Sequence, residues 1–293
     1  PVAVGGFYDV PGLPPTSVRM AAYARYAPDL AMQAIAGLGD ALDPARLTHI
    51  VVASCTGFVP PGIDQILAKR LELAPTVERV LIGFMGCYAG VTALRTARHI
   101  VRSEPDAVVL VVGVELSTLH LSLADQPEPL LAMLQFSDGA AAGIVSAAAH
   151  GFELGEGRSL ALGDSEDLIR WDIGDKGFEM QLSGEVPARL REALSTPSVR
   201  EQLFGTGTPP PLLAVHAGGR SVLDAVEHAL DVPGEALADS RAVLARFGNM
   251  SSATILFVLA DMMARGAQGE GVAIAFGPGL AAEAIHFTAP GRP

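Results

Sequence analysis

The sequence has little cysteine, few aromatic residues and no long apolar run. Its 293 residues include only two cysteines, Cys55 and Cys87, and a single tryptophan. Two cysteines argue against a disulfide framework. No uninterrupted apolar stretch reaches the roughly 18 residues that a membrane-spanning helix needs. The N-terminal segment also lacks the basic region and long apolar core of a secretory signal. We therefore expect a globular, cytoplasmic protein without a membrane span.

Basic residues are scarce as well. The chain has 20 lysines and arginines against 32 acidic residues, a net charge of −12 and a pI near 5.0. Because the basic residues are scattered, the sequence argues against a nucleic-acid partner. It also lacks a glycine-rich phosphate loop followed by lysine, and a close pair of His or Cys with metal-ligand spacing. We expect no metal and no cofactor, so the chemistry must come from side chains.

Apolar runs alternate with helical patterns along the chain. Runs rich in Val and Ile occupy residues 48–55, 77–84 and 107–115, and helical patterns occupy residues 17–38, 63–73 and the segment from Cys87. Continuous apolar strands of this kind are typical of α/β sheets covered on both faces. In the second part we expect hairpins and loops over 151–184, strands at 139–147, 211–219, 271–279 and 283–288, and helices at 187–193, 222–230, 237–246 and 252–264.

The two parts of the chain resemble each other. Residues 77–115 and 240–279 share one order of turns, helices and strands, with Gly86–Cys87 and Gly248–Asn249 at matching turns. Chance is the other explanation, since βαβ units look alike. A duplication would divide the chain into halves, 1–150 and 151–293. It would also place Cys87 and Asn249 at the N-termini of equivalent helices that meet near the centre.

Cys87 lies in GFMGCYAG, between a predicted strand and a predicted helix. The first free N–H groups and the positive end of the helix dipole favour the thiolate, which is the reactive form. Small neighbours such as Gly86 and Gly90 would let a substrate approach closely. The other interpretation is a buried structural cysteine that packs as a small hydrophobe.

Two further polar residues stand at the ends of apolar elements. His216 ends the run in PLLAVHAGG, and Asn249 lies in FGNMSS. Each has a structural alternative: His216 could be a buried histidine of a turn, and Asn249 could be a helix N-cap, for which Asn is among the best residues.

Together, GFMGCYAG, VHAGG, FGNMSS and FGPGL (276–280) resemble the Cys, His and Asn motifs and the closing segment of type III polyketide synthases, the chalcone synthase-like family. The similarity extends from about residue 17 to the end of the chain. The resemblance implies a thiolase-like fold, with duplicated βαβαβ halves stacked as α-β-α-β-α layers. It also implies a homodimer that acts on an acyl-CoA starter and malonyl-CoA.

The resemblance assigns a role to each of the three residues. Cys87 would be the nucleophile that carries the growing chain as a thioester. His216, if cationic, would hold the thiolate as an ion pair. His216 and Asn249 would donate hydrogen bonds to the enolate formed when malonyl-CoA loses carbon dioxide, an effect of roughly 3 to 4 kcal/mol per donor.

Further positions follow from the resemblance. Phe136 matches a gatekeeper phenylalanine, and Met180 stands where a second gatekeeper ring is usual. The remaining positions expected to contact substrate are Ser117, His120, Trp171, Gly218, Gly219 and Ser251. Core packing is the other interpretation for Phe136 and Trp171.

The chain departs from the family pattern at two places. Ala217 follows the histidine where proline is usual, which removes a restraint on φ. Family members also carry a further segment before the nucleophile, with a first strand and basic residues that contact the CoA phosphates. Nothing here matches it, and we expect such residues to be omitted or disordered, because a missing first strand leaves an open sheet edge.

The resemblance also suggests a substrate. The segment CTGFVPPGID (55–64) resembles enzymes that act on fatty acyl starters, and Met180 suggests an adaptable cavity. We therefore expect a fatty acyl-CoA starter and an alkylpyrone or alkylresorcinol product, with an aromatic starter as the second choice. Two other functions stay open: a β-ketoacyl-acyl-carrier-protein synthase of fatty acid initiation, and a catalytically silent thiolase-fold partner that binds acyl groups. Cys55 reads as a buried thiol at a strand end.

Overall fold

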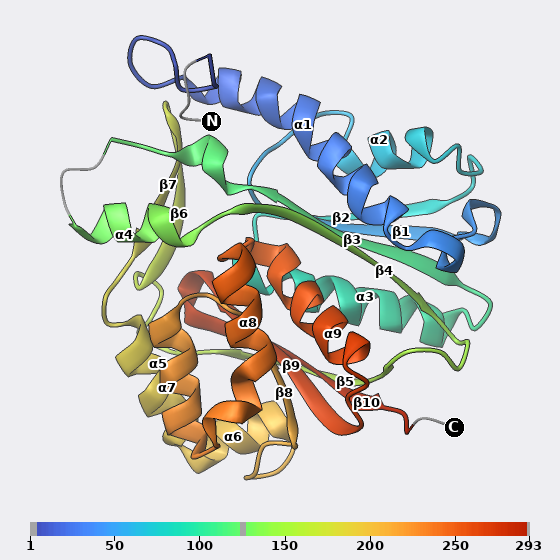
Figure 1. Cartoon of the computed structure of the whole chain (residues 1–293), viewed down its shortest axis with the longest axis vertical. Coiled ribbons are helices and arrows are strands. Elements are labelled where there is room, and N and C mark those ends of the chain that lie inside the picture. The colour runs from blue at the N-terminus through green and yellow to red at the C-terminus, as the bar shows by residue number, and fades with distance from the viewer. Residues whose placement is uncertain (1–4, 124–126, 292–293) are drawn as a thin grey trace.

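The chain forms two mixed β-sheets in the computed structural model, which describes residues 5–123 and 127–291 (Figure 1). The first sheet has the order β2–β1–β3–β4. β1 runs parallel to β2 and β3, and β4 runs antiparallel to β3. The central strands are buried apolar runs, as the sequence predicted. The strands span His49–Ser54 (β1), Glu78–Gly83 (β2), Val108–Leu116 (β3) and Asp138–Ser146 (β4).

The second sheet has the order β5–β10–β9–β8. β8 runs parallel to β9, and β9 and β10 form an antiparallel hairpin. β8 and β9 thus correspond to β1 and β3, which are also parallel neighbours. β10 corresponds to β4, because each runs antiparallel to the strand that precedes it in the chain. The two sheets share this part of their topology. The strands span Glu153–Ala161 (β5), Leu212–Val215 (β8), Gly269–Gly277 (β9) and Ala281–Ala289 (β10).

Helices form three layers around the two sheets (Figure 1). α3 (Ala89–Ser103) and α9 (Thr254–Ala264) lie between the sheets and share one apolar core with the facing strands. α1 (Thr16–Ala36) and α2 (Ile63–Arg70) cover the outer face of the first sheet. α5 (Val186–Ser195) and α7 (Arg220–Leu230) cover the second sheet and form a third apolar core with it. This α-β-α-β-α order confirms the predicted fold class.

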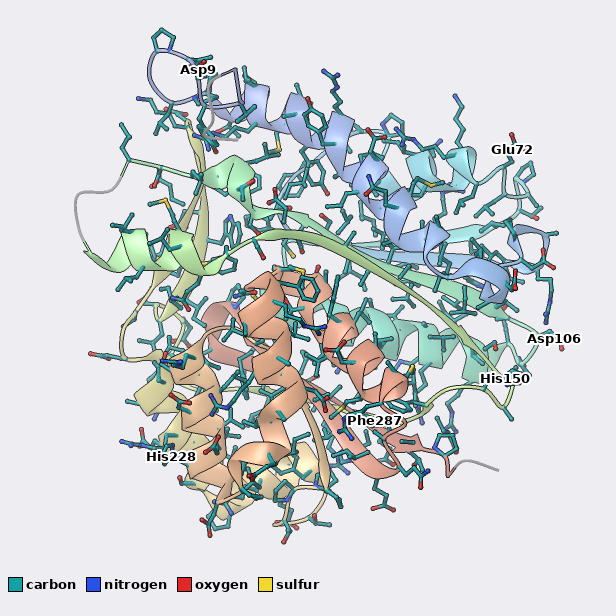
Figure 2. The ribbon with its side chains drawn as sticks, in the orientation of Figure 1. Asp9, Glu72, Asp106, His150, His228 and Phe287 are labelled. Carbon is teal, nitrogen blue, oxygen red and sulfur yellow. The ribbon has the colours of Figure 1, made fainter. Side chains whose placement is uncertain are left out.

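Side chains fill the space between the layers (Figure 2). Phe287 on β10 is 2% exposed and stacks on Phe152, with ring centroids 4.9 Å apart. Asp9 and His228, by contrast, lie at the surface of the molecule. The apolar side chains thus hold the two sheets together from within.

Residues 151–184 differ in part from the expected loops and hairpins. β6 (Ile169–Gly174) and β7 (Gly177–Leu182) form a hairpin, as predicted. β5, however, pairs with β10 far along the chain, a contact that no local pattern specifies. The structure adds the helices α4 (Pro127–Gln135) and α6 (Pro197–Phe204), and α8 (Ala238–Phe247) lies where a helix was expected. Residues 1–4 and 292–293, at the outer ends of the expected halves, lie outside the described residues.

Candidate active site

Cys87 lies in a short 3₁₀ turn between β2 and α3. The turn spans Gly86–Tyr88, and α3 begins at Ala89, two residues later than the sequence suggested. Gly86 has a φ of +77°, and a Cβ at this position would lie 2.4 Å from Cδ of Pro278. Only glycine meets both conditions without strain. Gly86 therefore shapes the turn that presents Cys87, whose side chain is buried.

The turn before α9 packs closely against α3. A Cβ on Gly90 would lie 2.2 Å from the carbonyl oxygen of Ser252, so a larger residue would push α3 away. Ser252 belongs to a 3₁₀ turn, Ser251–Ala253, which follows Asn249. The start of α3 and the start of α9 meet in this way, as the repeated pattern suggested.

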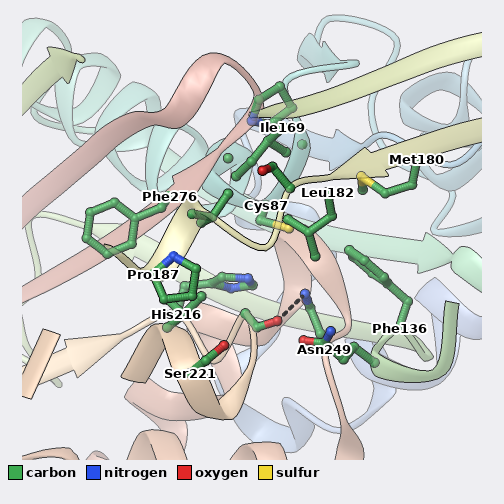
Figure 3. Close-up of a pocket in the computed structure, with 18 of the residues that line it drawn as sticks. Cys87, Phe136, Ile169, Met180, Leu182, Pro187, His216, Ser221, Asn249 and Phe276 are labelled. Atoms are coloured by element: carbon green, nitrogen blue, oxygen red, sulfur yellow. Dashed lines mark hydrogen bonds between the residues drawn. The ribbon is translucent and has the colours of Figure 1, made fainter. Parts of the chain in front are cut away.

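Cys87, His216 and Asn249 line one cavity of about 290 Å³ (Figure 3). They come from three separate loops: Cys87 follows β2, His216 follows β8 and Asn249 precedes α9. The structure thus brings together the three residues that the motifs singled out.

Hydrogen bonds fix the direction of the Asn249 amide. Its Oδ1 accepts from the backbone N–H of Ser251 at 2.8 Å. Its Nδ2 donates to the carbonyl of Gly218 at 3.2 Å (Figure 3). Because Ser251 offers a fixed N–H, the oxygen of the amide must face it. An amide nitrogen carries two hydrogens, so one remains for a group in the cavity. Asn249 can donate there without titrating.

Both ring nitrogens of His216 are free to meet a ligand. The backbone N–H of His216 donates to the carbonyl of Ile274 at 2.8 Å, and its carbonyl accepts from the N–H of Gly218 at 2.9 Å. The turn therefore forms with Ala217 in place of proline. The side chain is 1% exposed, and within residues 5–123 and 127–291 neither Nδ1 nor Nε2 has a hydrogen-bond partner.

Burial disfavours the charged forms of both Cys87 and His216. It raises the pKa of Cys87 to about 11, although Ser251 and Asn249 face the thiol and favour the thiolate. It lowers the pKa of His216 to about 4. Burial therefore opposes the expected ion pair, because removal from water disfavours both charges. Sequence motifs do not show how completely two groups are desolvated.

Some of the positions carried over from the resemblance line the cavity, namely Phe136, Trp171, Met180 and Gly218. The rings of Phe136 and Trp171 meet edge to face, with centroids 6.1 Å apart. The others lie outside its lining: Ser117, His120, Gly219 and Ser251. Ser251 still faces the thiol of Cys87, as its effect on the pKa of Cys87 shows.

His120 belongs to an aromatic cluster beside the cavity. Its ring stacks on Phe178, with centroids 4.1 Å apart. Its Nδ1 accepts from the backbone N–H of Phe178 at 3.0 Å, so Nε2 carries the proton and donates to the carbonyl of Thr56 at 2.6 Å. Burial lowers the pKa of His120 to about 4. The neutral ring joins the β6–β7 hairpin to the segment that follows β1.

Sequence reasoning missed several lining residues. Ser221 and Val222 come shortly after the histidine motif, so extending that motif by a few residues would have found them. Phe276 and Pro278 lie within the FGPGL segment itself, so that motif already contained them. No such signal marks the residues on α4, α5 and the β6–β7 hairpin, which are Leu131, Gln135, Ile169, Leu182, Val186, Pro187 and Leu190.

Residues 5–123 and 127–291 hold no group of three or more His, Cys, Asp or Glu side chains that could bind a metal ion. No helix in these ranges is long and apolar enough to cross a membrane.

Comparison with known proteins identifies the family. Residues 15–149 match the family described as "Chalcone and stilbene synthases, N-terminal domain", and residues 156–289 match the corresponding C-terminal domain. Pks18 of Mycobacterium tuberculosis, described as "alpha-pyrone synthesis polyketide synthase-like", is 34% identical over 273 residues, which cover 88% of this chain and 69% of that protein. A putative chalcone synthase of Bacillus subtilis is 29% identical over 267 residues, covering 85% of this chain and 72% of that protein.

Solved structures agree with the sequence comparison. The type III polyketide synthase 1,3,6,8-tetrahydroxynaphthalene synthase of Streptomyces coelicolor superimposes with a TM-score of 0.87 at 29% identity, over 95% of this chain and 82% of that one. PKS-I of the brown alga Ectocarpus siliculosus gives a TM-score of 0.86 at 29% identity, over 94% and 78%. The chain therefore belongs to the chalcone and stilbene synthase family and is a type III polyketide synthase, a condensing acyltransferase with the thiolase-like fold.

Proposed function

We propose that this enzyme condenses malonyl-CoA onto an acyl group carried by Cys87 and then cyclises the extended chain. The observation that carries the proposal is the convergence of Cys87, His216 and Asn249 on one cavity, where His216 and the Nδ2 of Asn249 keep free hydrogen-bonding capacity. Those are the groups that acyl transfer and enolate stabilisation require.

Loading begins with the uncharged pair. As Sγ of Cys87 attacks the thioester carbonyl of the starter, its proton passes to a free nitrogen of His216. The carbonyl re-forms, the bond to the CoA sulfur breaks, and His216 returns the proton to that sulfur. A proton transfer that accompanies the attack fits a cavity in which burial disfavours either charge alone.

Extension uses the same donors. The thioester oxygen of malonyl-CoA would lie between an N–H of His216 and the free Nδ2–H of Asn249. Cleavage of the bond to the carboxylate releases carbon dioxide and leaves an enolate, which each donor stabilises by roughly 3 to 4 kcal/mol. The enolate carbon then attacks the acyl carbonyl on Cys87, and the Cys87 sulfur leaves as the thiolate.

The starter we propose is a fatty acyl-CoA, and the product an alkylpyrone or alkylresorcinol. The name of Pks18, which refers to alpha-pyrone synthesis, supports this choice. The lining supports it too, because the residues around the catalytic three are mainly apolar, among them Ile169, Leu182 and Leu190.

We further propose that CoA thioesters are the substrates, that no cofactor takes part, and that the enzyme works as a cytoplasmic homodimer. Support for the dimer comes from β2, an edge strand on which Leu81 is 47% exposed, and from Phe84 at its end, which contacts the 48% exposed Phe58. Light scattering should give twice the mass of the chain, and Leu81→Asp should halve it.

The decisive experiment incubates the purified enzyme with malonyl-CoA and a panel of fatty and aromatic acyl-CoAs and identifies the products by mass spectrometry. We expect products from fatty starters and none from the Cys87→Ala variant. Condensation only with malonyl-acyl-carrier protein would instead indicate a fatty acid initiation enzyme. A complete absence of product and of malonyl-CoA turnover would indicate a silent acyl-binding partner.

A further inference from the structure

Glu115 is a buried carboxylate that lies near the end of β3 and outside the cavity. Its side chain is 0% exposed, and it does not line the cavity. Burial raises the pKa of Glu115 to about 7, whereas hydrogen bonds from Ser252, Cys55 and Thr56 favour its charged form. A buried carboxyl group must be held by hydrogen bonds. The donors lie in two separate segments, which Glu115 therefore connects.

The two oxygens of Glu115 face two different parts of the fold. Oε2 accepts from the backbone N–H of Cys55 at 2.9 Å and from the hydroxyl of Thr56 at 2.8 Å, both just after β1. Oε1 accepts from the hydroxyl of Ser252. A single side chain thus joins the end of β1 to the turn before α9.

The Cys55 contact leads to the nucleophile. The backbone N–H of Gly86 donates to Sγ of Cys55 at 3.0 Å, and the same sulfur lies 3.6 Å from the carbonyl oxygen of Gly86. Gly86 directly precedes Cys87 in the 3₁₀ turn. Cys55, expected from the sequence to be a buried thiol, therefore holds both polar groups of the residue on which the position of Cys87 depends.

The Ser252 contact leads to the oxyanion donor. Ser252 lies in the turn Ser251–Ala253, and the N–H of Ser251 fixes the amide of Asn249. The carbonyl of Ser252 also packs against Gly90 of α3. A shift of Ser252 would move the segment that orients Asn249.

We propose that Glu115 is a positioning residue for the condensation, holding the turn of Cys87 through Cys55 and the turn of Asn249 through Ser252. It touches no substrate. It fixes the separation between the sulfur that carries the acyl chain and the amide that stabilises the enolate. This inference rests on the proposed function and adds one residue to it, Glu115, which contacts segments in both halves of the fold.

An apolar side chain cannot replace the carboxyl group in this place. Oε2 of Glu115 meets the backbone N–H of Cys55, and Oε1 meets the hydroxyl of Ser252. Methionine has a similar length but no oxygen, so it can accept neither hydrogen bond. In Glu115→Met both catalytic turns therefore lose their link.

The test measures malonyl-CoA turnover in Glu115→Met, Cys55→Ala and Ser252→Ala. We expect Glu115→Met to lower kcat about 100-fold, the scale of a small misplacement of reacting groups, with KM nearly unchanged. The matched control is Glu283→Met, which removes another buried carboxylate, paired with Arg95, and should leave kcat near that of the wild type.

Double variants separate positioning from general destabilisation. Because methionine has already removed both links, adding Cys55→Ala or Ser252→Ala to Glu115→Met should cause no further loss of kcat. Independent effects in either cycle, or a Glu115→Met variant with wild-type kcat, would overturn the proposal. Absence of malonyl-CoA turnover in the wild type would refute the proposed function alone. In that case the same two double-mutant cycles are measured on the rate at which iodoacetamide alkylates Cys87. Coupling in these cycles would support the positioning role of Glu115, and independent effects would overturn it.

Discussion

Phe136 and Asn249 pair their backbones in an isolated parallel bridge. The N–H of Asn249 donates to the carbonyl of Gln135, and the N–H of Ser137 donates to the carbonyl of Asn249, each at 2.9 Å. The ring of Phe136 and the amide of Asn249 both line the cavity. The bridge therefore couples the residue at the proposed gate to the proposed oxyanion donor, and a shift of one moves the other.

Replacing the Asn249 amide should abolish most enolate stabilisation. We expect Asn249→Ala to slow malonyl-CoA decarboxylation by about 100- to 1,000-fold. Asn249→Asp should be at least as damaging, since a carboxylate cannot donate and would face the carbonyl of Gly218. Release of labelled carbon dioxide measures the rate. An Asp variant with wild-type decarboxylation would remove Asn249 from this role.

The two cysteines should differ in reactivity. Iodoacetamide should modify Cys87 before Cys55, because Cys87 lines the cavity whereas Cys55 is 1% exposed and hydrogen-bonded to Gly86. The rate at Cys87 should rise with pH up to about 11, where burial places its pKa. Mass spectrometry of the two peptides follows both reactions. Equal rates would count against Cys87 as the accessible nucleophile.

Trp171 should limit the length of the product. Its indole lines the cavity and contacts the ring of Phe136, so Trp171→Ala enlarges the space for the growing chain. We expect the longest product to gain at least one malonyl-derived unit, seen by mass spectrometry. The matched control is Phe152→Ala, which removes a ring that stacks on Phe287 away from the cavity. An unchanged product range in Trp171→Ala would show that other residues set the length.

Gly90 should tolerate no side chain. A methyl group there would meet the carbonyl of Ser252, so Gly90→Ala should lower the free energy of unfolding by about 1 to 3 kcal/mol despite the better helix propensity of alanine. The control is Gly143→Ala on β4, where a Cβ has no atom within 4 Å. Urea titration compares the two. A Gly90→Ala variant as stable as Gly143→Ala would contradict the close approach of α3 and the Ser252 turn.

Acid should destabilise the fold through His120. Burial lowers its pKa from 6.5 to about 4 in the folded chain, so below pH 6.5 the unfolded chain takes up the proton more readily. The stability that His120 contributes is present above pH 6.5 and is lost as the pH falls through about 4, a change of roughly 3 kcal/mol. In His120→Gln this titration is absent, so stability should fall less between pH 6.5 and 4. Urea titrations at several pH values measure both slopes, and parallel slopes would contradict the buried neutral ring.

The sequence was sufficient for the parts of the fold that local patterns encode. Buried strands such as β1 and β3 are continuous apolar runs, and the turns of Cys87, His216 and Asn249 carry recognisable motifs. The meeting of the first and last of these turns followed from the repeated pattern, since equivalent helices of a duplicated fold start near its centre.

Contacts between distant segments could not be predicted in the same way. The pairing of β5 with β10 depends on the whole topology. After β3 the chain enters a 3₁₀ turn at Ser117–His120, which directs His120 toward Phe178 rather than into the cavity. A position matched to a family motif therefore does not show which way its side chain turns.

Protonation states also lay beyond the sequence. The motif suggested an ion pair of Cys87 and His216, whereas complete burial of both favours the uncharged forms. Desolvation depends on every residue that closes the cavity, many of them far from either motif.

The ring nitrogens of His216 serve the reaction rather than the stability of the fold. Neither ring nitrogen of His216 bonds to another described group of the protein, so the fold gains no hydrogen bond from this buried ring. A thermostable variant of this enzyme could arise by filling that position with an apolar side chain, and it would be inactive. A bound thioester that accepts a hydrogen bond from His216 should instead raise the melting temperature and keep the catalyst intact.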